Sequence, residues 1–148
     1  MSISFQQIHQ ISIDAAWYTQ PFKGFCLDSR KLEAGQIFIA LNSYSQPEKT
    51  RLFAENALNA GALAVISETD LGLANEWVCP EVRYLMGEWQ KQYLQAVDPV
   101  TALRGIAVTG TNGKTTISRL IAELISSQRQ GCAVMGTTGN GILPNLTP

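Results

Sequence analysis

The feature that most constrains the fold is a strand–loop–helix–strand pattern in the last third of the sequence. The apolar run at 105–108 (GIAV) is typical of a strand buried in a parallel sheet. Residues 114–128 have the spacing of an amphipathic helix. Its apolar stripe consists of Ile117, Leu120, Ile121, Leu124 and Ile125. Because a second apolar run follows at 132–135 (CAVM), we expect a right-handed βαβ unit with two parallel strands.

A glycine-rich loop, TGTNGKTT at 109–116, joins the expected strand to the helix. Its spacing is shorter than that of the common P-loop, which has four residues between its first glycine and its Gly-Lys pair. A loop in this position presents the unpaired amides and the positive dipole end of a helix N-terminus to an anion. The alternative is a plain glycine turn before a surface helix, but the strand and helix on either side favour a phosphate site.

The residues of this loop have distinct expected roles. The ammonium of Lys114 can reach the β and γ phosphates of a nucleotide, which makes it the candidate catalytic residue. The hydroxyl of Thr115 is a hard oxygen ligand of the kind Mg²⁺ prefers. The full set of expected phosphate contacts is Gly110, Thr111, Asn112, Gly113, Lys114, Thr115 and Thr116.

The first two thirds of the chain predict a separate α/β domain. Three apolar runs predict strands, and two periodic segments predict helices. The expected strands are 25–28, 36–41 and 62–68, and the expected helices are 51–60 and 84–95. Val97-Asp98-Pro99 reads as a linker, because a proline disfavours helix in the residue before it. We therefore expect one domain at 1–98 and a second at 99–148, and the second to be incomplete, since two parallel strands do not make a stable sheet.

Charge and cysteine content exclude several classes of protein. The net charge of −1 comes without the basic stripe of a nucleic-acid binder. Three distant cysteines and a single histidine do not have the spacing of a zinc site. The N-terminus has no secretory pattern, and no run of about 18 apolar residues occurs. We expect a cytoplasmic protein with no membrane or nucleic-acid partner.

Four motifs in this order resemble the Mur ligases, the ATP-dependent enzymes that extend the peptide of the bacterial cell-wall precursor. The loop matches the family's shortened phosphate loop throughout. The other three motifs are DSRKLEAGQIFIAL at 28–41, NALNAGALAVISE at 56–68 and VMGTTGNGI at 134–142. The last motif resembles the corresponding segment in the branch of the family that adds the third residue of the stem peptide. The resemblance implies a small uridine-binding α/β domain followed by the first βαβ unit of a P-loop ATPase domain.

The resemblance also implies a reaction and a second ligand. ATP and Mg²⁺ activate the γ-carboxylate of UDP-MurNAc-L-Ala-D-Glu as an acyl phosphate, and the amine of a diamino acid, usually meso-diaminopimelate, displaces phosphate. The implied UDP-sugar contacts are Leu27, Ser29, Tyr44, Ser45 and Gln46. Asp28 and Arg30 either touch this ligand or form an ion pair that shapes its pocket. The 42–53 loop departs from the family pattern, because it lacks the usual Asp-Gly at its far end.

Three alternatives remain at the level of sequence. One is the Mur ligase that adds the terminal dipeptide, which shares the N-terminal motif. Another is a non-catalytic nucleotide-sugar-binding module, and the third is an unrelated P-loop kinase or ATPase, which the DSR motif argues against. Because the family's remaining sites lie outside these 148 residues, we expect this monomeric chain alone to be inactive, with weak UDP-sugar binding and almost no ATP binding.

Overall fold

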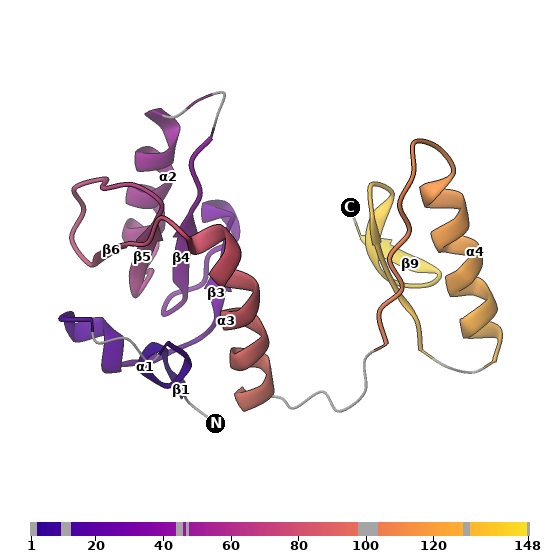
Figure 1. Ribbon diagram of the computed structural model, residues 1–148, viewed down its shortest axis with the longest axis horizontal. Coiled ribbons are helices and arrows are strands. Elements are labelled where there is room, and N and C mark those ends of the chain that lie inside the picture. Colours follow the sequence, from indigo (N-terminus) through magenta and orange to yellow (C-terminus); the bar gives the residue numbers. More distant parts are fainter. Residues whose placement is uncertain are drawn as a thin grey trace. The chain divides into compact units, whose positions relative to one another are not determined.

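The computed structural model describes residues 3–9, 13–43, 46, 48–97, 104–128 and 131–147. The chain divides into two compact units, Met1–Thr101 and Ala102–Pro148 (Figure 1). The expected domain boundary at 98/99 lies outside the described residues, so the assignment of the two domains stays a prediction.

The first unit is built on a four-stranded parallel sheet. Its strands are β3 (Phe25–Cys26), β4 (Ile37–Ala40), β5 (Ala64–Ser67) and β6 (Glu76–Val78), in that spatial order. The three strands expected from the apolar runs are confirmed within two residues at either end. The fourth strand, β6, was not expected. The α/β class is thereby confirmed.

Two helices cover this sheet, one on each face. In β4 and β5, alternate side chains point to opposite faces. Phe38, Ala40 and Val65 pack with Ala54 and Ala57 of helix α2 (Glu48–Asn59). Ile37, Ile39, Ala64 and Ile66 pack on the other side with helix α3 (Val82–Val97). Both helices are longer than expected, and α2 is followed by Gly61 in a left-handed conformation (φ +95°), as its C-terminal position predicts.

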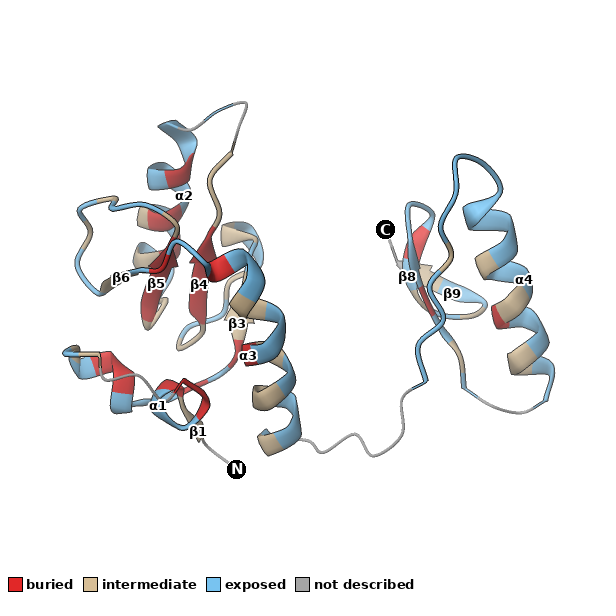
Figure 2. Ribbon diagram, viewed as in Figure 1, coloured by how far each residue is buried: buried red, intermediate tan, exposed pale blue. Residues whose placement is uncertain are grey.

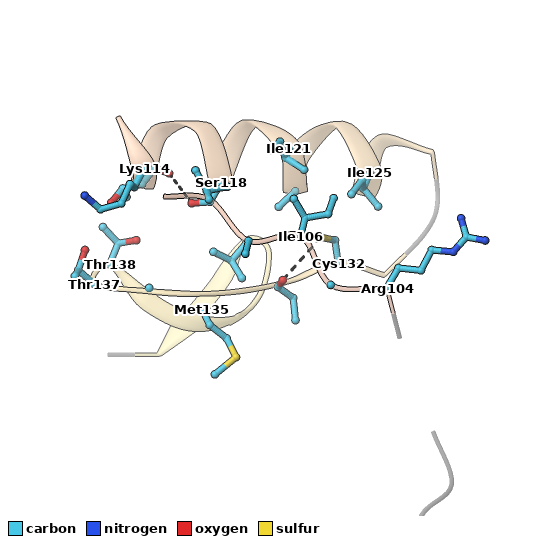
Figure 3. Close-up of a pocket in the computed structure, with 18 residues that line it drawn as sticks. Arg104, Ile106, Lys114, Ser118, Ile121, Ile125, Cys132, Met135, Thr137 and Thr138 are labelled. Carbon is cyan, nitrogen blue, oxygen red and sulfur yellow. Dashed lines mark hydrogen bonds between the residues drawn. The ribbon is translucent and has the colours of Figure 1, made fainter. Parts of the chain in front are cut away.

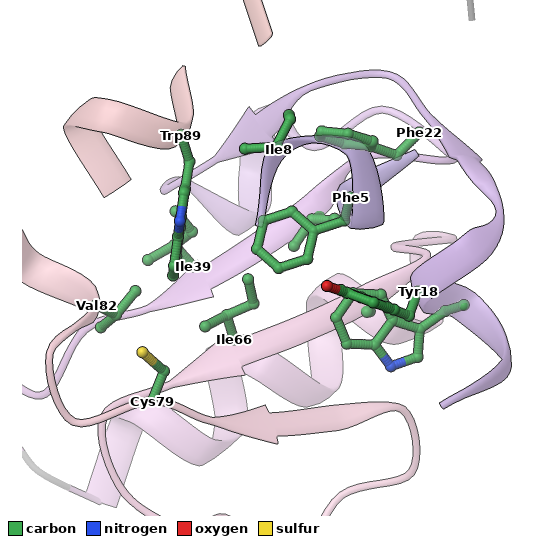
Figure 4. Packing of buried hydrophobic residues seen from close by; sticks show 12 residues of the cluster. Phe5, Ile8, Tyr18, Phe22, Ile39, Ile66, Cys79, Val82 and Trp89 are labelled. Carbon is green, nitrogen blue, oxygen red and sulfur yellow. The ribbon is translucent and has the colours of Figure 1, made fainter. Parts of the chain in front are cut away.

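The N-terminal segment closes the α3 side of the sheet. It contains β1 (Ile3–Ser4), α1 (Phe5–Ile8), a 3-10 turn η1 (Ala16–Thr19) and β2 (Pro21–Phe22), and β1 pairs antiparallel with β2. Phe5 is fully buried, and its ring lies 5.1 Å from that of Trp89 and 5.8 Å from that of Trp17 (Figure 4). The hydroxyl of Tyr18 donates to the carbonyl of His9. This aromatic core fixes α3 against the sheet.

The second unit differs from the expected βαβ arrangement. Helix α4 (Lys114–Ser127) forms as predicted, and it is followed by β7 (Ala133–Gly136), β8 (Gly139–Ile142) and β9 (Asn145–Thr147). These strands make an antiparallel sheet in the order β7-β8-β9. Residues 104–108 form no strand, and the side chain of Ile106 is 62% exposed. The predicted parallel strand at 105–108 is therefore wrong in this structure, because a buried parallel strand needs a hydrogen-bonded neighbour and 105–108 has no ladder with β7.

The apolar stripe of α4 is only partly covered. Ala122 is the one residue of the helix that is buried among those described, and Leu124 is 67% exposed. Ile117 and Leu120 are about half exposed. Figure 2 shows that most of the α4 ribbon has the colour of exposed residues. The amphipathic pattern thus predicted the helix correctly, but the described part of this unit supplies little surface to bury the stripe.

Candidate nucleotide-binding sites

The loop before α4 has the backbone shape that its glycines allow. Gly110 has φ +141° and Gly113 has φ +77°, both in the region that side chains rarely adopt. A Cβ placed on Gly113 would meet only the Cδ1 atom of Ile117, at 3.7 Å, which is an ordinary contact. The backbone conformation, and not a lack of space, therefore requires glycine at this position.

Gly113 is the N-cap of α4, so the loop ends where the helix amides begin. The amide of Ile117 makes a helical hydrogen bond to the Gly113 carbonyl at 2.9 Å. The amides of Lys114, Thr115 and Thr116 precede that bond in the first turn of the helix. These are the positions at which a helix N-terminus offers N–H groups to an anion.

The side chain of Lys114 folds back over the loop. Its Nζ atom donates to the carbonyl of Gly110 at 2.6 Å and to that of Thr111 at 3.2 Å. The predicted residues 110–116 are all exposed, and the structure brings them into one continuous turn. This turn fits a nucleotide phosphate with Mg²⁺, because it combines amides, a cation and the Thr115 hydroxyl on one accessible surface.

A hollow of about 570 Å³ adjoins this loop. Its lining comes from residues 104–108, the inner side of α4 and β7 with the turn after it. Figure 3 shows Lys114 and Ser118 at one end together with Thr137 and Thr138, and Arg104 toward the other end. The two threonines were not predicted as site residues, although they lie in the VMGTTGNGI motif that contributed to the family resemblance.

The predicted UDP-sugar residues lie at the carboxyl edge of the parallel sheet. Leu27 and Ser29 follow β3, and Gln46 lies in the connection from β4 to α2. Figure 1 labels β3, β4 and α2. Because β3 and β4 are parallel neighbours, both connections leave the same edge, which is where open α/β sheets bind ligands. Leu27 is exposed and Ser29 half-buried. Tyr44 and Ser45 lie outside the described residues.

Asp28 and Arg30 form an ion pair at this edge. Asp28 is the N-cap of a 3-10 turn, η2 (Ser29–Lys31), and accepts from the Arg30 amide at 3.1 Å. The Arg30 guanidinium also donates to both carboxylate oxygens, at 2.9 and 2.8 Å. These hydrogen bonds lower the pKa of Asp28 to about 2. The structure shows an ion pair that shapes the turn carrying Ser29, and contact of these two residues with the ligand stays a prediction.

A second charged group at this edge was not predicted. Glu68 follows β5, and Arg83 lies in the first turn of α3. The Arg83 Nε atom donates to Glu68 Oε1 at 2.5 Å, and both residues bond the backbone of Asn42 after β4. The two residues are 15 positions apart in the sequence, so only the fold brings them together.

The described residues give little support for a metal site, a disulfide or a membrane-spanning helix. No three His, Cys, Asp or Glu side chains among the described residues converge on a metal position. The three cysteines are unpaired, and burial raises the pKa of the Cys79 thiol. Within the part of the chain that the structure describes, no helix has the length and apolar character needed to cross a membrane.

Comparisons with known proteins give consistent likenesses. Residues 108–147 match the model of the Mur ligase middle domain. The chain is 40% identical over 128 residues to a UDP-N-acetylmuramoyl-L-alanyl-D-glutamate--2,6-diaminopimelate ligase of Haemophilus influenzae (strain 86-028NP), covering 81% of this chain and 26% of that protein. A ligase of the same name from Vibrio cholerae serotype O1 is 36% identical over 132 residues, covering 82% of this chain and 26% of that protein.

A solved structure gives a further likeness. It is described as that of a UDP-N-acetylmuramoyl-L-alanyl-D-glutamate--2,6-diaminopimelate ligase, and it is 78% identical to this chain with a TM-score of 0.87. The match covers 100% of this chain and 30% of that one. The chain thus spans about a quarter of the length of the curated relatives it matches.

Proposed function

This chain belongs to the Mur ligase family, and from that premise we propose that it forms the nucleotide-binding part of an ATP-dependent ligase of peptidoglycan synthesis. The ligase adds a diamino acid, meso-diaminopimelate, to UDP-MurNAc-L-Ala-D-Glu. The observation that carries this proposal is the Gly110–Thr116 turn at the start of α4, in a chain 78% identical to a solved ligase of that name. The reaction belongs in the cytoplasm, where ATP is available.

In this proposal the 110–116 loop holds the phosphates of ATP. The first-turn amides of α4 and the positive end of its dipole face the phosphate oxygens. The Lys114 ammonium exchanges its carbonyl partners for the phosphates and stabilises the negative charge of the transferred phosphoryl group. Thr115 would be the ligand of this chain for Mg²⁺, which supplies further charge neutralisation when bound.

The reaction joins two substrates through an activated carboxylate. An oxygen of the D-glutamate γ-carboxylate attacks the γ-phosphorus, ADP leaves, and an acyl phosphate forms. The amine of the diamino acid then attacks the carbonyl carbon, the C–O bond to phosphate breaks, and an amide and inorganic phosphate result. The loop acts in the first step, which is mainly a matter of positioning and electrostatics.

The UDP part of UDP-MurNAc-L-Ala-D-Glu is assigned to the carboxyl edge of the parallel sheet. Leu27 offers an exposed apolar side chain, and Ser29, two residues further on, offers a half-buried hydroxyl. The connection after β4, including Tyr44, Ser45 and Gln46, completes the pocket in this proposal. Parallel neighbours β3 and β4 support it, because they direct both connections to one edge.

Ligation requires more than these residues in our proposal. The curated relatives are about four times as long as the matched segment, and the stripe of α4 is largely exposed in this structure. We propose that the 148 residues alone are a monomer that forms no amide bond, and that the remaining length supplies the amino-acid site.

The test is a chimera. This chain replaces the matching segment of the Haemophilus influenzae relative, and the purified protein is incubated with ATP, Mg²⁺, UDP-MurNAc-L-Ala-D-Glu and meso-diaminopimelate. We expect the tripeptide product by mass spectrometry, at a rate within about tenfold of the unmodified relative. UDP binding without product in a folded chimera would instead favour a non-catalytic nucleotide-sugar module.

A further inference from the structure

The residue that follows β4 by two positions is held by its main chain. The amide of Asn42 donates to Glu68 Oε2 at 2.5 Å, and its carbonyl accepts from Arg83 Nη2 at 2.9 Å. The two side chains come from the end of β5 and the start of α3, 26 and 41 residues further along the chain. The amide and the carbonyl of Asn42 are thereby both held by side chains from distant elements.

Glu68 and Arg83 also bind each other. Arg83 donates from Nε to Oε1 at 2.5 Å and from Nη2 to Oε2 at 3.1 Å, so the guanidinium and carboxylate meet as two forks. The Glu68 side chain is only 13% exposed and that of Arg83 38%. Burial raises the pKa of Glu68, but the hydrogen bonds from Arg83 and the Asn42 amide lower it by more, so the carboxylate is charged at neutral pH.

Further hydrogen bonds extend from Asn42 into the connection between β4 and α2. The Thr69 hydroxyl donates to Asn42 Oδ1 at 3.3 Å. The Ser43 amide donates to the hydroxyl of Thr50, a buried residue of α2, at 3.4 Å. The Ser43 hydroxyl accepts from the Gln46 amide at 3.2 Å. The fixed point at Asn42 is therefore connected to Gln46, one of the residues assigned above to the UDP-sugar pocket.

We propose that Glu68 and Arg83 are positioning residues that set the described residues of the loop after β4, Asn42, Ser43 and Gln46, for binding of the nucleotide-sugar. They act through the main chain of Asn42 and do not themselves touch the ligand. The inference rests on the proposed function, because it takes the loop to contact UDP. We call the Glu68–Arg83 pair, with its hydrogen bonds to the main chain of Asn42, the clamp. A displacement of a binding loop by about 1 Å is enough to weaken a site strongly. Removal of the clamp therefore lowers the affinity for UDP without unfolding the sheet.

The experiment measures UDP binding by isothermal titration to the 148-residue chain and its variants, well below their melting temperatures. Arg83→Lys keeps the charge but loses the fork that reaches Glu68 and Asn42 together. Glu68→Gln keeps the shape but places an amide where the carboxylate accepted. We expect each to raise the Kd for UDP about tenfold or more. The matched controls are Arg51→Lys and Glu55→Gln, which alter an exposed ion pair on α2 and leave the Kd unchanged.

A second measurement separates positioning from general stability. Amide hydrogen exchange at Asn42 quickens in both clamp variants, while the amides of β4 and β5 keep their protection. If the wild-type chain does not bind millimolar UDP, the proposed pocket is wrong. If the wild type binds and both clamp variants bind equally well, the pocket stands and the positioning role is wrong. If a clamp variant does not fold, the other variant and the exchange at Asn42 decide the question.

Discussion

The ammonium of Lys114 lies 2.6 Å from the carbonyl oxygen of Gly110, at the opposite end of the loop that it closes. The lysine therefore contributes twice to the site. It holds the turn in shape through the main chain, and it keeps a positive charge beside the amides at the start of α4. An uncharged side chain of similar length therefore cannot replace Lys114, because it supplies neither the hydrogen bonds nor the charge.

Replacing Lys114 with Met in the chimera should lower the ligation rate by roughly a hundredfold or more, since the transition state loses a cation aimed at the developing phosphoryl charge. Phosphate release in the presence of all substrates measures the effect. The matched control is Lys91→Met on the exposed side of α3, which should leave the rate unchanged. A Lys114→Met rate within threefold of wild type would contradict the assigned role.

Gly113→Ala should weaken the start of α4, because an L-residue held at φ +77° is strained by about 1–2 kcal/mol. Hydrogen exchange of the first-turn amides reports the loss. Gly113→Asn should be less harmful, because Asn tolerates the left-handed region better than Ala. Gly105→Ala is the control, since a Cβ there meets nothing within 4 Å and its φ is not positive. Equal exchange in all three variants would show that the turn does not need its glycine.

The Asp28 carboxyl should titrate at about 2, below the ordinary value of 3.8, because Arg30 donates hydrogen bonds to its charged form. A lowered pKa means that the pair stabilises the fold above pH 3.8 and that this contribution is lost as the pH falls through about 2. NMR titration of the side-chain carboxyl measures it. In Arg30→Met the value should return toward 3.8, and in Lys31→Met it should move much less. An unchanged pKa of Asp28 in Arg30→Met would show that Arg30 does not cause the lowered value.

Ile66→Ala should destabilise the first unit by about 2–5 kcal/mol, because Ile66 is fully buried between β5 and the aromatic core around Phe5 (Figure 4). Urea unfolding followed by tryptophan fluorescence measures the change in the first unit, and hydrogen exchange of the α4 amides measures it in the second. Leu124→Ala on the exposed stripe of α4 should cost less than about 0.5 kcal/mol. A similar cost for both substitutions would mean that the stripe is buried in solution.

The central strands could be predicted from sequence because their signal is local. Ile37–Ala40 is apolar throughout and Ala64–Ser67 is apolar up to its last residue, and each is buried on both faces as such runs predict. The run at 105–108 is likewise apolar but forms no strand. The difference lies in the neighbours, because a strand exists only where another strand accepts its hydrogen bonds. Composition alone does not reveal that partner.

The candidate site residues show the same difference, because some have a local sequence signal and others depend on contacts between distant elements. The 110–116 loop could be predicted because its glycines, lysine and threonines are consecutive, and the left-handed angles of Gly110 and Gly113 agree with the expected tight turn. Glu68 and Arg83 could not, since the contacts that make them notable depend on a sheet edge formed by β4, β5 and α3. Tyr44 and Ser45 lie outside the described residues, so their assignment stays a prediction.

The most direct test of the central claim follows oxygen through the reaction of the chimera. The γ-carboxylate of D-glutamate in UDP-MurNAc-L-Ala-D-Glu is labelled with ¹⁸O at both oxygens, and the released phosphate is analysed by mass spectrometry. Activation as an acyl phosphate predicts one ¹⁸O in each phosphate released with product, and labelled phosphate that forms roughly a hundredfold more slowly in Lys114→Met. Unlabelled phosphate would contradict the account, since ATP would then be hydrolysed without activating the carboxylate.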